Sequence, residues 1–156
     1  PVRWNLATAK PVLGTNPTEK LLTNGIRGSL KYSDFEWCSW ADNDSVSFTI
    51  DLLKLEMLNT LILGCITNNG MAIHKPASVR VEVSDDNSKF REAVVQSFTS
   101  EEIFREGNFI ENLSLKLGGT QARYVRVTAK GPGVCPASHV RPGQTSRIFF
   151  DEVMLE

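Results

Sequence analysis

The sequence predicts an all-β fold, an antiparallel sandwich of two sheets, and three observations support this prediction. Apolar and polar residues alternate with a period of two in several runs, as in strands with one face on a core and one in water. Clusters of Gly, Asn and Pro separate these runs and favour tight reversals. Helical periodicity is scarce. Many regularly spaced strands with little helix are typical of a sandwich or a barrel.

The first alternating run covers residues 45–52, in which every second residue is apolar. The same pattern recurs at residues 79–83, 113–117 and 123–128. Residues 58–66 are apolar on both faces, which favours a central strand, although periodicity alone also allows a short buried helix. The last run, residues 148–155, is strand-like and contains an acidic pair.

Two short segments favour helical turns, residues 18–22 and residues 100–105. In the second, Ser100 is the expected N-cap, and Glu101 and Glu102 suit the first turn because their charge complements the helix dipole. We detect no internal repeat and no linker, so residues 1–156 are expected to form one domain.

The composition excludes several classes of function. Seventeen Lys and Arg residues against 18 Asp and Glu residues give a formal net charge of -1, too weak to hold nucleic acid or an anionic membrane by net electrostatics. The longest apolar stretch, around residues 61–66, is far shorter than a membrane span. The chain begins with Pro1 and lacks the features of a signal peptide, so we expect it to be part of a longer protein.

The three cysteines, Cys38, Cys65 and Cys135, are an odd number with wide spacing that matches no zinc-ligand pattern. We expect buried, small apolar side chains for most of them. One disulfide stays open as an alternative in an oxidising compartment.

Enzymatic motifs are not found in the sequence. There is no Gly-x-Ser-x-Gly elbow, no phosphate-binding glycine loop and no His-Glu-x-x-His, and only two histidines could act as a base. Asp51 and Glu82 fall on the expected solvent face of strands, where a solvated carboxylate is the usual finding. A carboxylate pair assembled by folding stays open, but the sequence predicts no catalytic site.

Several segments, in order, resemble the discoidin, or coagulation factor 5/8 type C, domain family. They are residues 5–12, 21–29, Trp37, and residues 48–52, 76–87, 122–127 and 150–153. The resemblance implies an eight-stranded antiparallel jelly roll. The loop at residues 24–29 and the stretch at residues 135–139 are most similar to the domain that follows the catalytic domain in bacterial family 20 hexosaminidases, or chitobiases. Relatives classed as family 32 carbohydrate-binding modules bind sugars in loops at one end of the sandwich.

The resemblance also implies a structural calcium ion. Its ligands would be the side chains of Asn24, Ser29 and Glu152, with carbonyls near Leu22 and Arg27. Asn24 replaces the family's usual Asp, which removes one negative charge and should lower the affinity for calcium. Alternatively, Asn24 belongs only to a turn, Glu152 pairs with Arg27, and the loop is empty or holds sodium.

Sugar recognition needs an aromatic face for the apolar side of the ring and polar groups for the hydroxyls. The residues that offer this chemistry are Tyr32, Trp40, Asn68, Asn69, His74, His139 and Arg141. Trp37 and Trp4 are expected to pack instead, since Trp is buried on average. In the hexosaminidase-associated relatives a Trp often precedes the histidine, whereas here Ser138 precedes His139.

These observations predict a non-catalytic, carbohydrate-binding accessory domain of a secreted, cell-surface or periplasmic glycoside hydrolase. Its partners would be a terminal sugar, such as N-acetylglucosamine, N-acetylgalactosamine or galactose, and the parent catalytic domain in cis. One alternative is a structural module that packs on its parent and binds no ligand. Another is a membrane-surface or protein-binding domain, as in the coagulation relatives, and the near-zero charge argues against the membrane.

Overall fold

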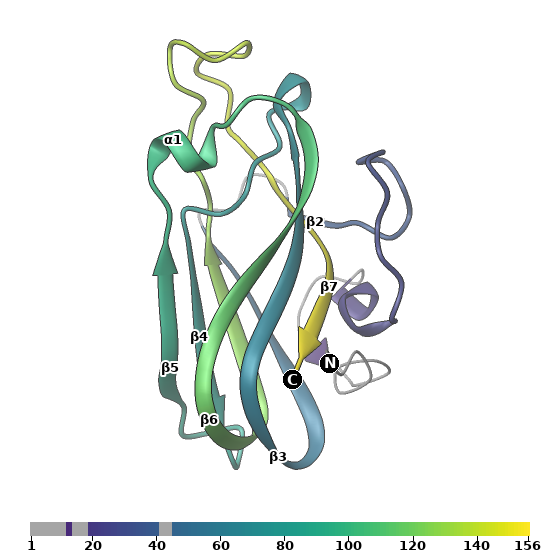
Figure 1. Ribbon diagram of the computed structural model, residues 1–156, viewed down its shortest axis with the longest axis vertical. Helices are drawn as coiled ribbons and strands as arrows, with labels where there is room; N and C mark the ends of the chain where they lie inside the picture. The colour runs from purple at the N-terminus through teal and green to yellow at the C-terminus, as the bar shows by residue number, and fades with distance from the viewer. Residues whose placement is uncertain (1–11, 14–18, 41–44) are drawn as a thin grey trace.

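The computed structural model describes residues 12–13, 19–40 and 45–156, which form two packed layers of antiparallel β-structure (Figure 1). The strands are β1 (Val12–Leu13), β2 (Cys38–Trp40), β3 (Ser45–Asn68), β4 (Ser78–Ser84), β5 (Arg91–Ser97), β6 (Asn108–Lys130) and β7 (Ile148–Leu155). The helices are the 3-10 turns η1 (Glu19–Thr23) and η2 (Asn69–Met71) and the short α1 (Ser100–Ile103). Trp4, which was expected to pack, lies outside the described residues.

The strand order is β2-β7-β3-β6-β4-β5, with β1 paired to β3, and every strand pairing is antiparallel. The predicted all-β antiparallel sandwich is therefore confirmed. The described residues contain seven strands, and not the eight that the resemblance implies, which leaves the fold class unchanged. Residues 58–66 are confirmed as a central strand, because this part of β3 pairs with both β6 and β7.

The long strands β3 and β6 pass through both layers. Their pairing shifts register between Asp51 and Glu56, and again between Leu58 and Thr60. Leu53 on β3 and Gly118 and Gly119 on β6 have φ angles of 70°, 70° and 76°, in the left-handed region that bends a strand sharply. The two strands therefore fold over at the lower end of the view in Figure 1 and carry one hydrogen-bonded sheet into two layers.

The core forms where the alternating faces of the two layers meet. Phe48 and Ile50 of β3 lie in it with Val125 and Val127 of β6 and Phe150 of β7, all almost fully buried. A smaller apolar cluster consists of Trp37, Ile66, Ile73 and Phe149, with Tyr32 packed against it. The period-two pattern predicted this division because alternate residues of a strand point to opposite faces.

The start of α1 differs from the prediction by one residue. The N-cap is Thr99 and not Ser100: the Thr99 hydroxyl accepts from the Glu102 amide, and the Glu102 carboxylate accepts from the Thr99 amide at 2.7 Å. This reciprocal capping box satisfies two backbone donors that the first turn would otherwise leave unpaired. None of the helices in the described parts of the chain is long and apolar enough to cross a membrane.

The β7 strand contains a β-bulge at its acidic pair. Leu63 of β3 pairs with Val153 and Cys65 pairs with Phe150, so the two β7 residues in between, Asp151 and Glu152, face Gly64 alone. An extra residue in one strand interrupts the alternation of side chains. Both carboxylates thus turn toward the segment of residues 24–28, which donates hydrogen bonds to them, and they are 0% and 1% exposed.

Candidate binding site at the loop end

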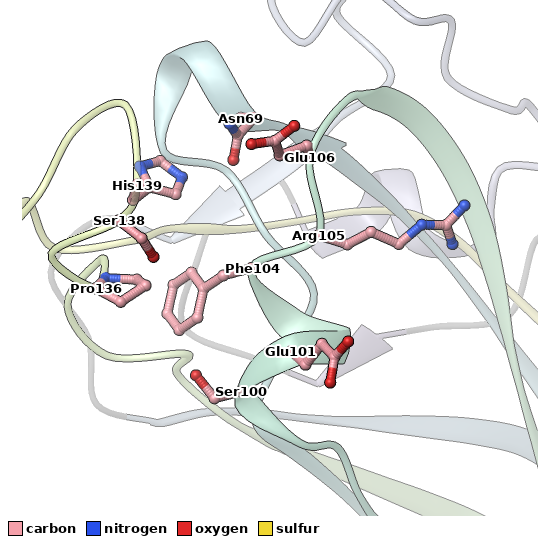
Figure 2. A pocket seen from close by; sticks show the side chains of 9 residues that line it. All are labelled: Asn69, Ser100, Glu101, Phe104, Arg105, Glu106, Pro136, Ser138 and His139. Atoms are coloured by element: carbon pink, nitrogen blue, oxygen red, sulfur yellow. The ribbon is translucent and has the colours of Figure 1, made fainter.

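A cavity of about 500 Å³ opens at the end of the sandwich where α1, η2 and the loop of residues 131–147 gather (Figures 1 and 2). It is lined by Asn69, Ser100, Glu101, Phe104, Arg105, Glu106, Pro136, Ser138 and His139. Its volume lies within the usual range for small-molecule sites, and its lining combines an aromatic ring with several polar groups.

Asn68 and Asn69 have different roles at this end. Asn68 is the N-cap of η2, and its Oδ1 accepts from the Met71 amide at 3.2 Å, so its carbonyl oxygen serves the turn. The backbone amide of Asn69 donates to the Gly107 carbonyl at 3.0 Å and ties this turn to the segment after α1. The Asn69 side chain lines the cavity, and its buried Oδ1 has no hydrogen-bond partner among the described residues.

Phe104, at the C-cap of α1, supplies the aromatic ring of the cavity (Figure 2). Its ring lies edge-on to the rings of His74 and His139, with centroid distances of 5.1 and 6.2 Å. Phe104, Glu101 and Glu106 were not among the predicted site residues. The sequence signal for Glu101 and Phe104 is the short helix expected at residues 100–105, which gives no indication of which face borders a cavity, and Glu106 follows that segment.

His74 and His139 are buried and hydrogen-bonded to each other, with 2.9 Å between their Nε2 atoms. The Nδ1 atom of His139 accepts from the Arg141 amide at 2.9 Å, so the proton of a neutral His139 ring resides on Nε2 and is donated to His74. Burial, followed by the neighbouring His139, lowers the pKa of His74 to about 4, against a smaller opposing effect of the Ile103 backbone. His74 is therefore neutral at physiological pH.

Cys135 completes this group, which we call the loop-end cluster: His74, Cys135 and His139. All three residues are buried, and the Cys135 Sγ and one ring nitrogen of each histidine lie within 4.8 Å of one another. The spacing of the three cysteines did not indicate this grouping. A local signal was the separation of Cys135 and His139 by three residues, while His74 is distant in sequence.

The predicted burial of the cysteines is confirmed for all three, and none forms a disulfide. Cys38 and Cys65 lie in the main core. Burial raises the pKa of the Cys135 thiol above its ordinary value.

The prediction that Trp40 is an exposed sugar platform is wrong. Trp40 is 8% exposed. Its ring stacks on Phe48 and lies edge-on to Phe150, with centroid distances of 6.3 and 5.6 Å, so it belongs to the core. Tyr32 packs edge-on against Phe149 at 6.2 Å in the smaller apolar cluster and does not line the cavity.

The other predicted sugar contacts divide between the wall of the cavity and its support. Asn69 and His139 line the cavity, as their predicted role requires. His74 is 0% exposed, so it supports Phe104 and His139 and does not reach a ligand directly. Arg141 is exposed, and its guanidinium donates through Nε to the Gly70 carbonyl, which holds the loop of residues 131–147 against η2.

The acidic pair on β7 forms a second group, the bulge cluster: Arg27, Asp151 and Glu152. Asp151 Oδ2 accepts from Arg27 Nε at 2.7 Å and from the Gly28 amide at 2.9 Å. The lack of a side chain at Gly64 makes room for this pair, because a methyl group there would overlap Asp151 Oδ1. The alternative that Arg27 pairs with Glu152 is therefore wrong, since the bulge brings Asp151 to the guanidinium.

Glu152 is held differently. Its Oε2 accepts from the Gly25 amide at 3.0 Å, and its buried Oε1 has no hydrogen-bond partner among the described residues. Burial is the main cause that raises the pKa of Glu152 to about 8, and the nearby Asp151 adds to it. Asn24 lies next to this carboxyl group, with its Oδ1 accepting from the Ile26 amide and its Nδ2 donating to Glu36 at 2.9 Å each.

The remaining predicted metal ligands lie around the same loop. The Ser29 hydroxyl accepts from the Lys31 amide at 3.2 Å, and the Leu22 side chain is fully buried in the core. The predicted packing role of Trp37 is confirmed: it is 6% exposed and donates from Nε1 to the Ser29 carbonyl at 2.9 Å. Its ring lies against Gly28, where a methyl group would overlap it.

Comparisons with known proteins agree with this architecture. The sequence profile of the F5/8 type C domain matches residues 7–141. No curated protein matches the sequence.

Three solved structures share the fold. Chitosan-binding module 1 from a chitosanase/glucanase of Paenibacillus sp. IK-5 is 14% identical, with a TM-score of 0.61 and coverage of 97% of this chain and 98% of that one. A Streptococcus pneumoniae fucose binding module is 19% identical, with a TM-score of 0.55 and coverage of 97% and 96%. The C-terminal domain of a chitobiase from Bacteroides fragilis is 19% identical, with a TM-score of 0.52 and coverage of 88% and 78%. With most of its length matched by the family profile, the chain belongs to the F5/8 type C domain family.

Proposed function

We propose that this chain is a non-catalytic carbohydrate-binding module that holds a sugar in the loop-end cavity. The names of the similar structures support the proposal, since they include a chitosan-binding module and a fucose binding module. The chitobiase domain supports the narrower proposal that the chain is an accessory part of a secreted, cell-surface or periplasmic glycoside hydrolase such as a chitobiase or hexosaminidase.

The observation that carries the proposal is the pairing of Phe104 with Asn69 in one cavity. The Phe104 ring offers an apolar face to a pyranose, and the side-chain amide of Asn69, which lines the same cavity, can hydrogen-bond a sugar hydroxyl. Ser138 and His139 add polar groups from the opposite wall (Figure 2).

The ligand we propose is an uncharged terminal sugar: N-acetylglucosamine, N-acetylgalactosamine or galactose. The near-zero net charge suits a ligand recognised by an apolar contact and hydrogen bonds. Binding would raise the local concentration of a parent catalytic domain, linked in cis, on its glycan, because tethering makes the second encounter intramolecular.

Titration calorimetry against these monosaccharides and against chitooligosaccharides tests the proposal. We expect one site per chain, with an affinity weakened about tenfold by Asn69→Ala, because one hydrogen bond to a sugar is lost. Asn59→Ala is the matched control, since Asn59 is an exposed asparagine near the bend of β3. Folded protein that gives no heat at millimolar sugar overturns the proposal.

A second candidate function is docking on a neighbouring domain without any ligand. Its support is three exposed apolar side chains near the bend of β3, Leu53, Leu55 and Met57, which are 54%, 52% and 55% exposed. Neighbouring apolar side chains exposed in this way mark docking surfaces in many proteins. If the docking hypothesis is correct, a separately produced parent catalytic domain forms a complex with the chain in size-exclusion chromatography, and Leu55→Ser abolishes this complex. No complex would contradict it.

The proposed calcium ion would be held by the side chains of Asn24, Ser29 and Glu152 and by carbonyls near Leu22 and Arg27. The unpartnered, buried Glu152 Oε1 fits a hard cation, and Glu36, hydrogen-bonded to Asn24, offers a further carboxylate. A bound calcium ion would neutralise Glu152 and join the loop to β7. Calcium should raise the melting temperature relative to chelator, more so in Asn24→Asp, and an unchanged melting temperature in both proteins would contradict the site.

A further inference from the structure

We propose that the loop-end cluster is a binding site for one zinc-class transition-metal ion, coordinated by His74, Cys135 and His139. The chain contains only two histidines, and both lie in this cluster with a buried cysteine. The proposal concerns a site separate from the bulge cluster and does not depend on sugar binding in the cavity.

The positions of the three donor atoms are close to what a tetrahedral ion requires. The two Nε2 atoms are 2.9 Å apart, and one ring nitrogen of each histidine lies within 4.8 Å of the Cys135 Sγ. At tetrahedral angles, zinc bonds of about 2.0 Å to nitrogen and about 2.3 Å to sulfur set N–N separations of about 3.3 Å and N–S separations of about 3.5 Å. To admit the ion, side-chain rotations would have to open the separation of the two Nε2 atoms and bring the Cys135 Sγ to bonding distance.

The donor types select the class of metal. Two imidazole nitrogens and one thiolate suit zinc and its neighbours in the transition series, whereas calcium and magnesium require oxygen ligands. The bulge cluster offers the opposite chemistry, carboxylate oxygens without nitrogen or sulfur ligands. The loop-end cluster should therefore reject calcium.

The surroundings of the His74 ring suit a metal ligand. Its Nδ1 is buried and makes no hydrogen bond of normal length within the described residues, while the Ile103 backbone interacts with the ring. Metal-bound imidazoles usually donate their second nitrogen to a carbonyl or a carboxylate. A slight approach of Nδ1 to the Ile103 carbonyl would supply that partner and direct Nε2 toward the ion.

Binding rearranges two protons. The Cys135 thiol releases its proton to solvent as the sulfur–metal bond forms. The proton on Nε2 of His139 moves to Nδ1, and the Arg141 amide, which now donates to Nδ1 at 2.9 Å, turns to water from its exposed loop. The loss of that one contact opposes the gain of three metal bonds, and one proton is released per ion.

The ion would join the loop of residues 131–147 to the segment after η2. The described β-pairing within this loop is a single isolated bridge between Val134 and Thr145. A metal link would therefore stabilise the loop further. Three protein ligands leave one position of a tetrahedral ion for water. Because His139 also lines the cavity, occupancy would fix part of the cavity wall.

The test uses the untagged chain, stripped with chelator and titrated with zinc and, separately, with cobalt. We expect one ion per chain, thiolate-to-cobalt charge-transfer absorption, and a melting temperature about 5–10 °C higher at a hundredfold excess over Kd. Cys135→Ser should abolish the charge-transfer band and weaken zinc binding at least about 100-fold. Cys65→Ala, which changes a cysteine in the main core, is the control and should keep both signals.

Cobalt binding without a thiolate band, or zinc affinity equal in the wild type and Cys135→Ser, would overturn the proposal. If Cys135→Ser does not fold, NMR spectra of the wild-type protein alone test the proposal. Its histidine ring nitrogens should show the proton of His139 moving from Nε2 to Nδ1 on zinc addition in NMR spectra, and unchanged ring signals would reject the site.

Discussion

The bulge cluster and the loop-end cluster both bury polar side chains, but these side chains are satisfied in different ways. In the bulge cluster, Asp151 is 0% exposed and is paired with Arg27 and the Gly28 amide. In the loop-end cluster, two histidines hydrogen-bond each other beside Cys135, and His139 borders a cavity of about 500 Å³. In the first cluster the charge of Asp151 is paired within the chain, whereas the second cluster borders a cavity that can admit a sugar.

This difference separates structural from functional polar groups in the molecule. A charge that is buried against its own loop stabilises the fold only while its partner is present. A polar group on the wall of a cavity can exchange water for a ligand at little cost to the fold. We therefore expect changes in the bulge cluster to alter stability and changes near the loop-end cluster to alter binding.

The largest effect should come from Asp151→Asn. The substitution leaves the Arg27 guanidinium, whose side chain is 29% exposed, without its charge partner. We expect a loss of about 2–4 kcal/mol in the free energy of unfolding, measured by urea denaturation, with sugar affinity unchanged.

The matched control is Glu82→Gln, which breaks the more exposed pair with Arg126, where the side chains are 19% and 35% exposed. Its loss should not exceed about 1 kcal/mol. Equal losses in the two variants would remove the distinction between the closed cluster and an ordinary surface pair.

The next effect is on the pH dependence of stability in chelator. The pKa of Glu152 is raised to about 8 in the folded state from an ordinary 4.5, so the folded protein retains a proton that the unfolded chain has released. The stabilisation is complete below pH 4.5 and is lost as the pH rises through 8. The melting temperature should fall between pH 5 and 8 by about 3–6 °C more in the wild type than in Glu152→Gln.

Calcium should reverse part of this fall in the wild type, because a cation replaces the proton on Glu152. Identical pH profiles of the wild type and Glu152→Gln would show that the buried carboxyl group does not control the stability of the bulge cluster.

A smaller effect should come from Phe104→Ala, and it should appear in binding. Loss of the aromatic face should weaken sugar binding about tenfold by titration calorimetry. The control is Phe90→Ala. Phe90 is also half-buried, and the Arg126 guanidinium carbon lies 3.8 Å from the centroid of its ring. A loss of sugar affinity in Phe90→Ala, with the affinity of Phe104→Ala unchanged, would show that the sugar does not bind at the loop end.

The smallest effect should be a gain from Ser138→Trp, which introduces the aromatic side chain that the hexosaminidase-associated relatives often carry before this histidine. Ser138 lines the cavity, so an indole there would face a bound sugar. We expect an affinity about threefold higher, measured by the same calorimetry. A weaker affinity would mean that the indole fills the cavity in place of the ligand.

The sequence predicted the framework well because strand alternation is a local signal. The runs at residues 45–52, 79–83 and 123–128 all lie in strands, and Val81 and Val127 point into the core as their alternation requires. The β5 strand was missed since its residues are exposed or only half-buried, which leaves no apolar alternation to detect.

The sites were predicted less completely because they depend on contacts between distant residues. The bulge that turns Asp151 toward Arg27 and the meeting of His74 with Cys135 arise only when separate segments pack. The aromatic and polar residues around Trp40 favoured a binding role in the sequence. In the structure Trp40 packs in the core, because Phe48 covers its ring. Phe104 had no neighbouring polar motif that would mark it.

Mapping of amide chemical shifts during a titration with N-acetylglucosamine or galactose tests the central claim most directly. We predict saturable shifts concentrated at Asn69, Phe104, Ser138 and His139, the residues that line the loop-end cavity. The amides of Gly25 and Gly28, which are bound to the bulge cluster, should not shift. Shifts centred on Gly25 and Gly28 or near Leu53, or no shifts at millimolar sugar, would contradict the account.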